Sequence, residues 1–423
     1  MSRVRILLAA TMLVAATAAR PLGAQRAGEP GAELTISVVT MGPGTAVWER
    51  FGHNAIRVTD AQTGADTTYN YGMFDFASER FFVRFAQGRM RYWTEGHPAD
   101  REIGHYIRAN RSVWIQELDL APAQRLALRD FLEWNAREEN RYYGYDPYRD
   151  NCSTRVRDAI DRVLGGVIEA QTSGIVTGTT YRSHTRRLTE PDPLSYTGIN
   201  TALGPATDRP ISAWEEMFIP LELRDHLRTI TIATPDGGTR PLVRSEITEF
   251  LSTDPEPPAE PPVWWPGHLA AGVATGLLLV ALGRRASARG ARAGFRVIGI
   301  GWSVLAGLAG VVLAGLWTLT DHTAAYANQN LFQLSPLSLP LAMLLPRVGR
   351  PGGPGRWTPR LAIAVAALAL TGLAWKALPL VQQANGEMIA LALPIQLAIA
   401  FAAWGDAQRT AALPAPGPQS SPG

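Results

Sequence analysis

The sequence predicts an α+β domain followed by an all-α bundle of membrane-spanning helices. Charged and aromatic residues crowd the part before Asp254, whereas Leu, Ala, Val and Gly dominate from about Val263 onward. A stiff proline-rich linker, 253–262 with the core DPEPPAEPP, separates the two parts. A chain of 423 residues is also too long for one ordinary globular domain. We therefore expect two domains of different kinds.

The first segment, 1–24, has the features of a secretory signal peptide. It opens with Arg3 and Arg5, continues as an apolar run and reaches the small residues Gly23 and Ala24. The apolar run is shorter than the roughly 20 residues that cross a bilayer, which disfavours the alternative of an uncleaved anchor. Either alternative exports residues 25–252.

Extended and helical patterns are mixed in residues 25–252. Runs bounded by Gly-rich or polar turns predict strands at Leu34–Thr40, Asn54–Thr59, Thr67–Tyr71 and Val113–Leu120. Apolar residues recur at helical spacing from Pro122 to about Glu138 and from Asn151 to Gly165. Residues 172–211 are rich in Thr, Ser, Gly and Pro, so we expect long loops with short helices there.

About five apolar stretches fill residues 263–404, and most are near the length that a spanning helix requires. They are Val263–Leu282, Val297–Leu319, Leu331–Leu345, Leu361–Leu380 and Met388–Trp404. The third contains Pro336 and Pro340, which predicts a broken or re-entrant segment. Residues 405–423 are expected to form a disordered cytoplasmic tail.

The arginines indicate which way the bundle faces. The loops after the first and third stretches are rich in Arg, whereas Thr320–Asn330 and Val381–Glu387 contain neither Lys nor Arg. Under the positive-inside rule the arginine loops lie in the cytoplasm. The predicted location is therefore a bacterial inner membrane, with residues 25–252 on the periplasmic side.

The sequence contains no motif typical of nucleic-acid, nucleotide or metal binding. The formal net charge is +3, but no basic run is interleaved with aromatic residues in the pattern that nucleic-acid binding uses. A P-loop, a dinucleotide fingerprint and metal-ligand spacing are also absent from the sequence. We expect no nucleic-acid partner, no cofactor and no metal.

Cys152 is the one cysteine of the chain, so an intramolecular disulfide is impossible. It directly follows Asn151, a residue type that favours the N-cap, and thus falls in the first turn of a predicted helix. Free backbone N–H groups and the helix dipole stabilise a thiolate there. The pattern favours a nucleophile over the alternative of a buried packing cysteine, which would more naturally lie in the middle of a helix.

A thiolate nucleophile usually needs a base, most often histidine. His53 follows Gly52 at the entry to a predicted strand, where backbone can approach closely and the ring can be held rigidly. His97 and His105 have the sequence context of surface residues. Taken alone, His53 also fits a hydrogen-bonded strand residue.

Three segments carry a resemblance to a known family: WERFGHNAIRV, YNYGMFDF and ENRYYGYDPYRDNCSTRVRD. Together they resemble the periplasmic domain of Lnb-type lipoprotein N-acyltransferases, and TDHTAAYANQNLFQLSPL resembles the membrane half of that family. The order of an early histidine strand and a later cysteine helix is also similar to the circularly permuted papain-like fold of NlpC-type enzymes.

The resemblance implies a role for each candidate residue. Cys152 would be the nucleophile and His53 the general base and acid, with a third polar residue, Asn70 or Asp75, orienting the imidazole. Amide donors would come from the neighbouring Asn54 and Asn151, and the backbone N–H of Cys152 would help to bind the oxyanion.

Weaker candidates surround this constellation. Tyr71, Tyr142 and Tyr143 belong to a dense group of aromatic residues that fits either core packing or an acyl-chain groove. His322 and Asn330 lie in a predicted outward-facing loop of the membrane half. They fit either solvated positions or contact with a lipid headgroup or a lipoprotein N-terminus.

The expected function is acyl transfer through an acyl-cysteine intermediate. The partners would be membrane phospholipid and lipoprotein substrates. The acyl donor would be an ester of a phospholipid or of a diacylglyceryl lipoprotein, and the N-terminal amine of a diacylated lipoprotein would accept the chain. One alternative keeps the fold and makes the protein a cysteine amidase or peptidase that acts on peptidoglycan. A second alternative is a non-enzymatic membrane sensor or scaffold.

Overall fold

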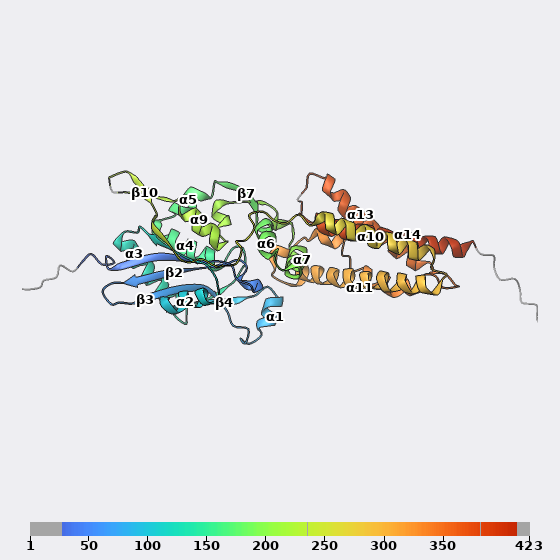
Figure 1. The fold of residues 1–423 in the computed structure, drawn as a ribbon, viewed down its shortest axis with the longest axis horizontal. Helices are drawn as coiled ribbons and strands as arrows, with labels where there is room; N and C mark the ends of the chain where they lie inside the picture. Colours follow the sequence, from blue (N-terminus) through green and yellow to red (C-terminus); the bar gives the residue numbers. More distant parts are fainter. Residues whose placement is uncertain (1–27, 235, 381, 413–423) are drawn as a thin grey trace, which may run out of the picture.

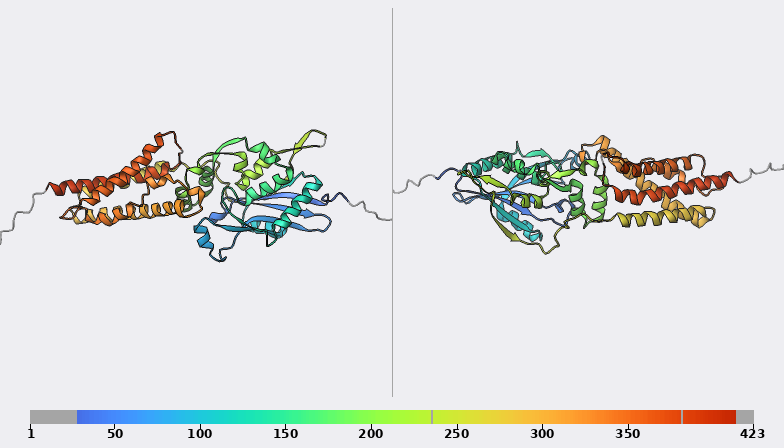
Figure 2. Two further views of the ribbon diagram at one scale, coloured as in Figure 1. Left: turned by 180° about the vertical axis from the view of Figure 1, so that it is seen from behind. Right: turned by 90° about the horizontal axis from the view of Figure 1, so that it is seen from above.

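The structure is a computed structural model that describes residues 28–234, 236–380 and 382–412. An α+β domain lies at one end of an elongated molecule and a bundle of long helices at the other (Figure 1). Views from behind and above show the same division, with the long helices running along the long axis (Figure 2). The predicted signal peptide and residues 413–423 of the predicted tail lie outside the described residues.

The α+β domain is built on a seven-stranded antiparallel sheet with the order β11-β5-β1-β2-β3-β4-β6. The strands are β1 Leu34–Met41, β2 His53–Asp60, β3 Asp66–Met73, β4 Arg91–Pro98, β5 Val113–Leu118, β6 Tyr142–Gly144 and β11 Val243–Phe250. The four predicted strands are confirmed with ends shifted by up to two residues. The sequence analysis missed β4, β6 and β11, of which β6 and β11 are the two edge strands.

Both faces of the sheet are covered by helices. Helix α2, Ala99–Arg108, packs on one face, where it meets Val39 and Met41 of β1. The opposite face carries α3 Pro122–Asn135, α4 Cys152–Leu164, α5 Val167–Thr172 and α9 Pro220–Leu227. Ile36 and Val38 of β1 point into this larger core, as the two-residue alternation of a strand requires.

Residues 172–211 are more regular than the predicted loops. They contain β7 Val176–Thr180, α6 Tyr181–Thr189 and α7 Pro193–Ala202, and β7 pairs with β8, Pro210–Ser212. Smaller elements complete the domain: α1 Phe81–Ala86, α8 Ala213–Glu216, β9 Thr231–Ala233 and β10 Thr239–Pro241. Helices α6 and α7 lie between the sheet and the long helices (Figure 1).

Four helices among the described residues are long and apolar enough to cross a membrane. They are α10 Trp265–Arg284, α11 Arg289–Leu319, α13 Trp357–Ala374 and α14 Gly386–Ala411. They correspond to four of the five predicted apolar stretches. The third apolar stretch is broken, as its prolines indicated, and contains the seven-residue α12, Ser338–Leu344. The predicted tail is corrected, because α14 continues through residues 405–411.

Small residues and buried amides hold the bundle together. Gly272 and Gly276 of α10 meet main-chain atoms of α14, so these two helices approach closely. Gln333, in the broken segment, donates to the carbonyl oxygen of Ala369 on α13, and Gln396 on α14 donates to the carbonyl oxygen of Gln333. These side-chain amides donate hydrogen bonds to backbone carbonyl groups, which the hydrocarbon of a bilayer cannot solvate.

The two arginine-rich loops lie together at the end of the bundle away from the sheet. Arg296 of α11 donates to the carbonyl oxygen of Val348, and Gly349 packs against Ala286. The arginine-free loop near residue 321 instead contacts the α+β domain, because the backbone N–H of Asp321 donates to the carbonyl oxygen of Gln87. This division agrees with the topology that the arginines predict.

The proline-rich linker has no regular secondary structure, but it is not a free spacer. Arg186 of α6 donates to the carbonyl oxygen of Pro262 at 2.8 Å. A second contact between the two halves involves amide side chains: Asn328 and Asn330 donate to the carbonyl oxygen of Thr201 at the end of α7. The two halves therefore dock through specific hydrogen bonds.

Candidate functional site

Cys152 occupies the first turn of α4, as the sequence predicts. Asn151 is the N-cap residue, and its side-chain oxygen accepts hydrogen bonds from the backbone N–H groups of Ser153 and Thr154 at 2.9 Å. At the other end of the helix, Gly165 adopts a left-handed conformation with φ of 71°. Both ends are therefore fixed by local signals, and the partly exposed thiol has a defined position.

Opposing effects act on the Cys152 thiol. Burial raises its pKa, whereas the backbone N–H groups of Asn54, Ser153 and Cys152 itself, and the positive charge of Arg111, lower it. The net result is a raised pKa, so the resting sulfur is a thiol. The N–H groups nevertheless surround the sulfur with donors that favour the anion once a base removes the proton.

His53 begins β2 and directly precedes Asn54, whose backbone N–H bonds to the thiol of Cys152. Its Nε2 is 2.9 Å from Oδ1 of Asn70 on β3, and its ring stacks on Tyr106 of α2 at 6.1 Å between centroids. Burial lowers the pKa of His53 to about 4, a shift that the Asn70 hydrogen bond opposes and Arg111 reinforces. The imidazole is therefore neutral at physiological pH and able to accept a proton.

The orientation of the imidazole follows from strand geometry. Asn70 pairs with Ala55, so the side chains of His53 and Asn70 share the α2 face of the sheet. With Nε2 donating to Asn70 Oδ1, Nδ1 is the proton-accepting atom. Asn70 thus engages Nε2 of the imidazole, and the backbone N–H groups engage the thiol.

Gly72 makes the close approach of helix and strand possible. It has φ of +85°, in the bulged part of β3, and a Cβ there would lie 3.5 Å from Cβ of Cys152. The ring of Tyr145 borders the same point and stacks on Tyr92 at 4.2 Å between centroids. The first turn of α4 thus packs against the backbone of Gly72, next to the ring of Tyr145.

Arg111 and Tyr106 are site residues that the sequence analysis missed. Arg111 is buried, donates to the carbonyl oxygen of Gly42 at 2.8 Å and lies 4.6 Å from the Tyr106 ring. Its charge acts on both His53 and Cys152. Neither residue stands in a recognisable motif, and a buried arginine after a short helix gives no signal in one sequence.

Three predicted polar side chains form other hydrogen bonds. Asp75 is an exposed turn residue whose carboxylate accepts the backbone N–H of Ala77 at 2.8 Å, so the assignment of Asp75 as orienting residue is wrong. The Asn151 amide donates to the carbonyl oxygens of Pro147 and Phe218, which corrects its assignment as an oxyanion donor. The Asn54 side chain donates to Thr40, which leaves only its backbone N–H facing the sulfur.

The three tyrosine candidates serve mainly to pack the domain. Tyr71 is 1% exposed and donates to Asn135 at 3.0 Å, so its assignment to a substrate groove is wrong. Tyr143 packs edge-on against Tyr71, with its ring 3.7 Å from the guanidinium of Arg155. Tyr142 lies on edge strand β6 beneath the guanidinium of Arg91, at 3.9 Å.

The predicted headgroup residues of the membrane half are structural. Nε2 of His322 lies 2.7 Å from the carbonyl oxygen of Phe85, at the end of α1. Asn330 is 1% exposed and bonded to Thr201. Both therefore join the two halves of the protein, which corrects their assignment to substrate binding.

One other group of side chains has the composition of a metal site. Ligand atoms of Glu216, Glu222 and His226 lie within 4.8 Å of one another. Glu216 is already bonded to His226 and His184, and Glu222 pairs with Arg187 at 2.6 Å. Burial raises the pKa of Glu216, but these partners outweigh burial and hold it well below its usual range. We interpret the group as an internal ion-pair network.

The fold and site together define a membrane protein with an α+β domain that carries a cysteine and a histidine outside the bundle. Comparison with known families refines this description. Residues 29–187 match the Lnb N-terminal periplasmic domain, and residues 272–409 match the Lnb transmembrane domain. These matches cover more than half of the chain, which belongs to the Lnb family.

Membership in this family also fixes the location. The protein is a multi-pass inner-membrane protein, and its N-terminal domain is periplasmic. No curated protein and no solved structure matched the chain. The similarity to the permuted papain-like fold therefore stays a prediction, although α4 does pack against an antiparallel sheet that bears His53.

Proposed function

We propose that the protein is a thiol-dependent acyltransferase that N-acylates diacylated lipoproteins. The observation that carries the proposal is the meeting of Cys152 with the backbone N–H of Asn54, the residue next to His53. This contact links the helix that begins with Cys152 to the strand that carries His53. Family membership and the adjacent membrane bundle favour substrates held in the bilayer.

In the first half-reaction His53 takes the thiol proton at Nδ1, and the sulfur of Cys152 attacks the ester carbonyl carbon of a phospholipid. The backbone N–H groups of Asn54 and Cys152 stabilise the developing oxyanion. The C–O ester bond then breaks, and the imidazolium returns the proton to the departing alkoxide. The products are a lysophospholipid and an acyl thioester on Cys152.

In the second half-reaction the free α-amine of the lipoprotein's terminal cysteine attacks the thioester. His53 accepts a proton from the amine, the C–S bond breaks and the thiol of Cys152 is restored. The product is an amide, so the exchange of an ester for an amide runs downhill without ATP. Asn70 is a positioning residue in both steps, because it fixes the tautomer of His53.

The decisive test is mass spectrometry of lipoprotein N-termini from cells whose own N-acyltransferase is replaced by this protein. We expect triacylated N-termini with the unaltered protein and diacylated N-termini with Cys152→Ser or His53→Ala. His105→Ala is a matched control, because His105 is exposed on α2 and should leave acylation intact. Diacylated lipoproteins persisting with the unaltered protein would refute the proposal.

A second readout separates the competing functions. A fatty acid that hydroxylamine removes from Cys152 is expected for acyl transfer. Release of peptide fragments from purified cell wall, with no lipid adduct, would indicate a peptidoglycan amidase instead. Full function of Cys152→Ser and His53→Ala would indicate a sensor or scaffold.

A further inference from the structure

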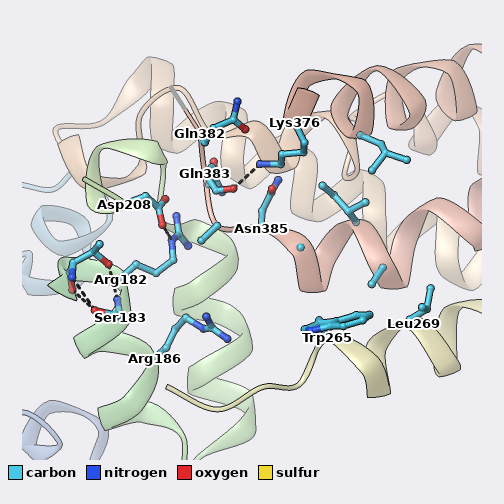
Figure 3. A pocket seen from close by; sticks show the side chains of 16 residues that line it. Arg182, Ser183, Arg186, Asp208, Trp265, Leu269, Lys376, Gln382, Gln383 and Asn385 are labelled. Atoms are coloured by element: carbon cyan, nitrogen blue, oxygen red, sulfur yellow. Dashed lines mark hydrogen bonds and ion pairs between the residues drawn. The ribbon is translucent and has the colours of Figure 1, made fainter. Parts of the chain in front are cut away.

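A cavity of about 640 Å³ lies where the periplasmic domain meets the outer ends of α10, α13 and α14 (Figure 3). Arg182 and Arg186 approach it from α6, and Lys376 approaches from the short helix η6, Trp375–Ala377. Trp265 and Leu269, in the first turns of α10, form the apolar wall. Cations thus face apolar side chains at the ends of these helices that lie toward the periplasmic domain.

Lys376 is the one lysine among the 40 basic residues of the chain. Its ammonium donates to Oε1 of Gln329 at 3.2 Å and to the carbonyl oxygen of Gln383 at 2.5 Å. Both acceptors are neutral, and an ammonium has three N–H donors. In the described part of the chain Lys376 forms no direct ion pair with a carboxylate, although Asp208 lines the same cavity.

The two arginines differ from Lys376 in this respect. Arg182 is almost fully buried and pairs with Asp208 at 2.7 Å, and Arg186 pairs with Glu387 at 2.9 Å. These carboxylates balance two of the three cations around the cavity. The third cation is the ammonium of Lys376, which has no such ion pair. An ammonium is a compact hydrogen-bond donor of the kind that binds phosphate.

An apolar groove of about the same volume continues from the cavity along α10, α13 and α14. On α10 the cavity residue Leu269 precedes the groove residue Val273 by one helical turn, and Val280 also lines the groove. From Leu269 to Val280 the helix rises about 16 Å. This length is close to half of the roughly 30 Å hydrocarbon core of a bilayer. A polar cavity with an apolar groove one leaflet deep has the shape of a single membrane lipid.

We propose that this site binds a glycerophospholipid of the outer leaflet, with its phosphate on Lys376 and an acyl chain in the groove. Trp265 lies at the headgroup level, where tryptophan is favoured. A diacylglyceryl group offers similar chains but no phosphate, so it cannot use the charge of Lys376. The site is separate from Cys152, and binding here does not depend on whether that thiol is a nucleophile.

The single lysine permits a direct test on the unaltered protein. Purified protein in a neutral detergent is treated with an amine-acetylating reagent, and acetylation of Lys376 is followed by peptide mass spectrometry. Phosphatidylglycerol should slow acetylation of Lys376 about tenfold, whereas diacylglycerol with the same chains should not. The N-terminal amine of the same chain is an internal control for reagent activity and should react at one rate throughout.

Two results would overturn the proposal. Equal acetylation rates with phosphatidylglycerol and diacylglycerol would exclude recognition of phosphate. An ammonium that resists acetylation even in lipid-free detergent would show that it does not face an accessible cavity. Repeating the experiment with Cys152→Ser distinguishes this site from the acyltransferase proposal, because protection of Lys376 should persist in that variant.

Retention of co-purified lipid gives an independent measurement. Lys376→Gln should lower the affinity for phosphatidylglycerol about tenfold, or ~1.4 kcal/mol, and Lys376→Arg should keep part of it. Arg356→Gln is a matched control, because it removes one cation at the opposite end of α13. Equal lipid content in all four proteins would contradict the proposal.

Discussion

Substituting Asn70 should change the pH at which the enzyme loses activity, in a direction set by the substitution. The His53 imidazole has a pKa of about 4, so the neutral base persists down to that pH in the unaltered protein. Asn70→Asp places a carboxylate 2.9 Å from Nε2, with nearly the same shape. An opposite charge this close raises a pKa by about 1–3 units, which moves the value for His53 to about 5–7.

The expected effect is large at mildly acidic pH. A pKa of 6 leaves about a tenth of the imidazole neutral at pH 5, whereas a pKa of 4 leaves about nine-tenths neutral. Asn70→Leu should act in the opposite direction, because the Asn70 hydrogen bond raises the pKa of His53. It also leaves the ring N–H without a partner, which costs about 1–3 kcal/mol, or roughly 5- to 150-fold in rate at all pH values.

The assay is single-turnover acylation of a diacylated lipopeptide in phospholipid micelles, measured by mass spectrometry between pH 4.5 and 8. The acidic limb of kcat/KM reports the free enzyme's base. Asn140→Asp is a control for an added charge, because Asn140 lies in the loop after α3 and its side chain donates to the carbonyl oxygen of Trp134. An acidic limb near pH 6.5 in the unaltered protein, or one that Asn70→Asp leaves in place, would refute the assignment of His53 as the base.

Three further substitutions test the surroundings of the thiol. Arg111→Gln removes a charge that lowers the pKa of the Cys152 thiol, so iodoacetamide should alkylate the single cysteine severalfold more slowly at pH 7.5; an unchanged rate would contradict the role of Arg111. Asn151→Ala removes the N-cap and leaves two carbonyl oxygens without donors, at about 2–4 kcal/mol, and should lower the melting temperature. Gly72→Ala forces an unfavourable φ at about 1–2 kcal/mol, whereas Gly144→Ala meets open space; equal melting temperatures for the two would contradict this.

The most accurate predictions from the sequence concern features with local causes. Asn151 and Gly165 bound α4 because an N-cap amide and a left-handed glycine act within one turn of the chain. The same holds for β1 to β3, whose alternation follows from burial of one side chain in two. The position of the thiol can therefore be predicted from the residues next to it in the sequence.

The remaining site residues depend on contacts between distant segments. The guanidinium of Arg111 donates to the carbonyl oxygen of Gly42, far from it in the sequence. The ring of Tyr106 stacks on His53 because α2 packs on the face of the sheet that carries this histidine. The error over Asp75 has the same origin, because a carboxylate a few residues beyond a strand gives no indication of whether the chain turns toward or away from the histidine. Asn70 lies opposite Ala55 and shares its face with His53 through a strand register that only the assembled sheet defines.

The docking of the two halves has a consequence for how lipids would reach the thiol. Asn328 and Asn330 satisfy carbonyl groups at the end of α7, which would otherwise lack partners, and His322 holds the end of α1. Helix α1 therefore lies beside the outer end of the bundle (Figure 1), and its side chains Phe82 and Phe85 are exposed. A domain held by these contacts cannot swing freely on its proline linker. Under the proposed function, a lipid would reach a thiol whose distance from the bundle is set by these contacts, past the groove along α10 or the exposed rings of α1.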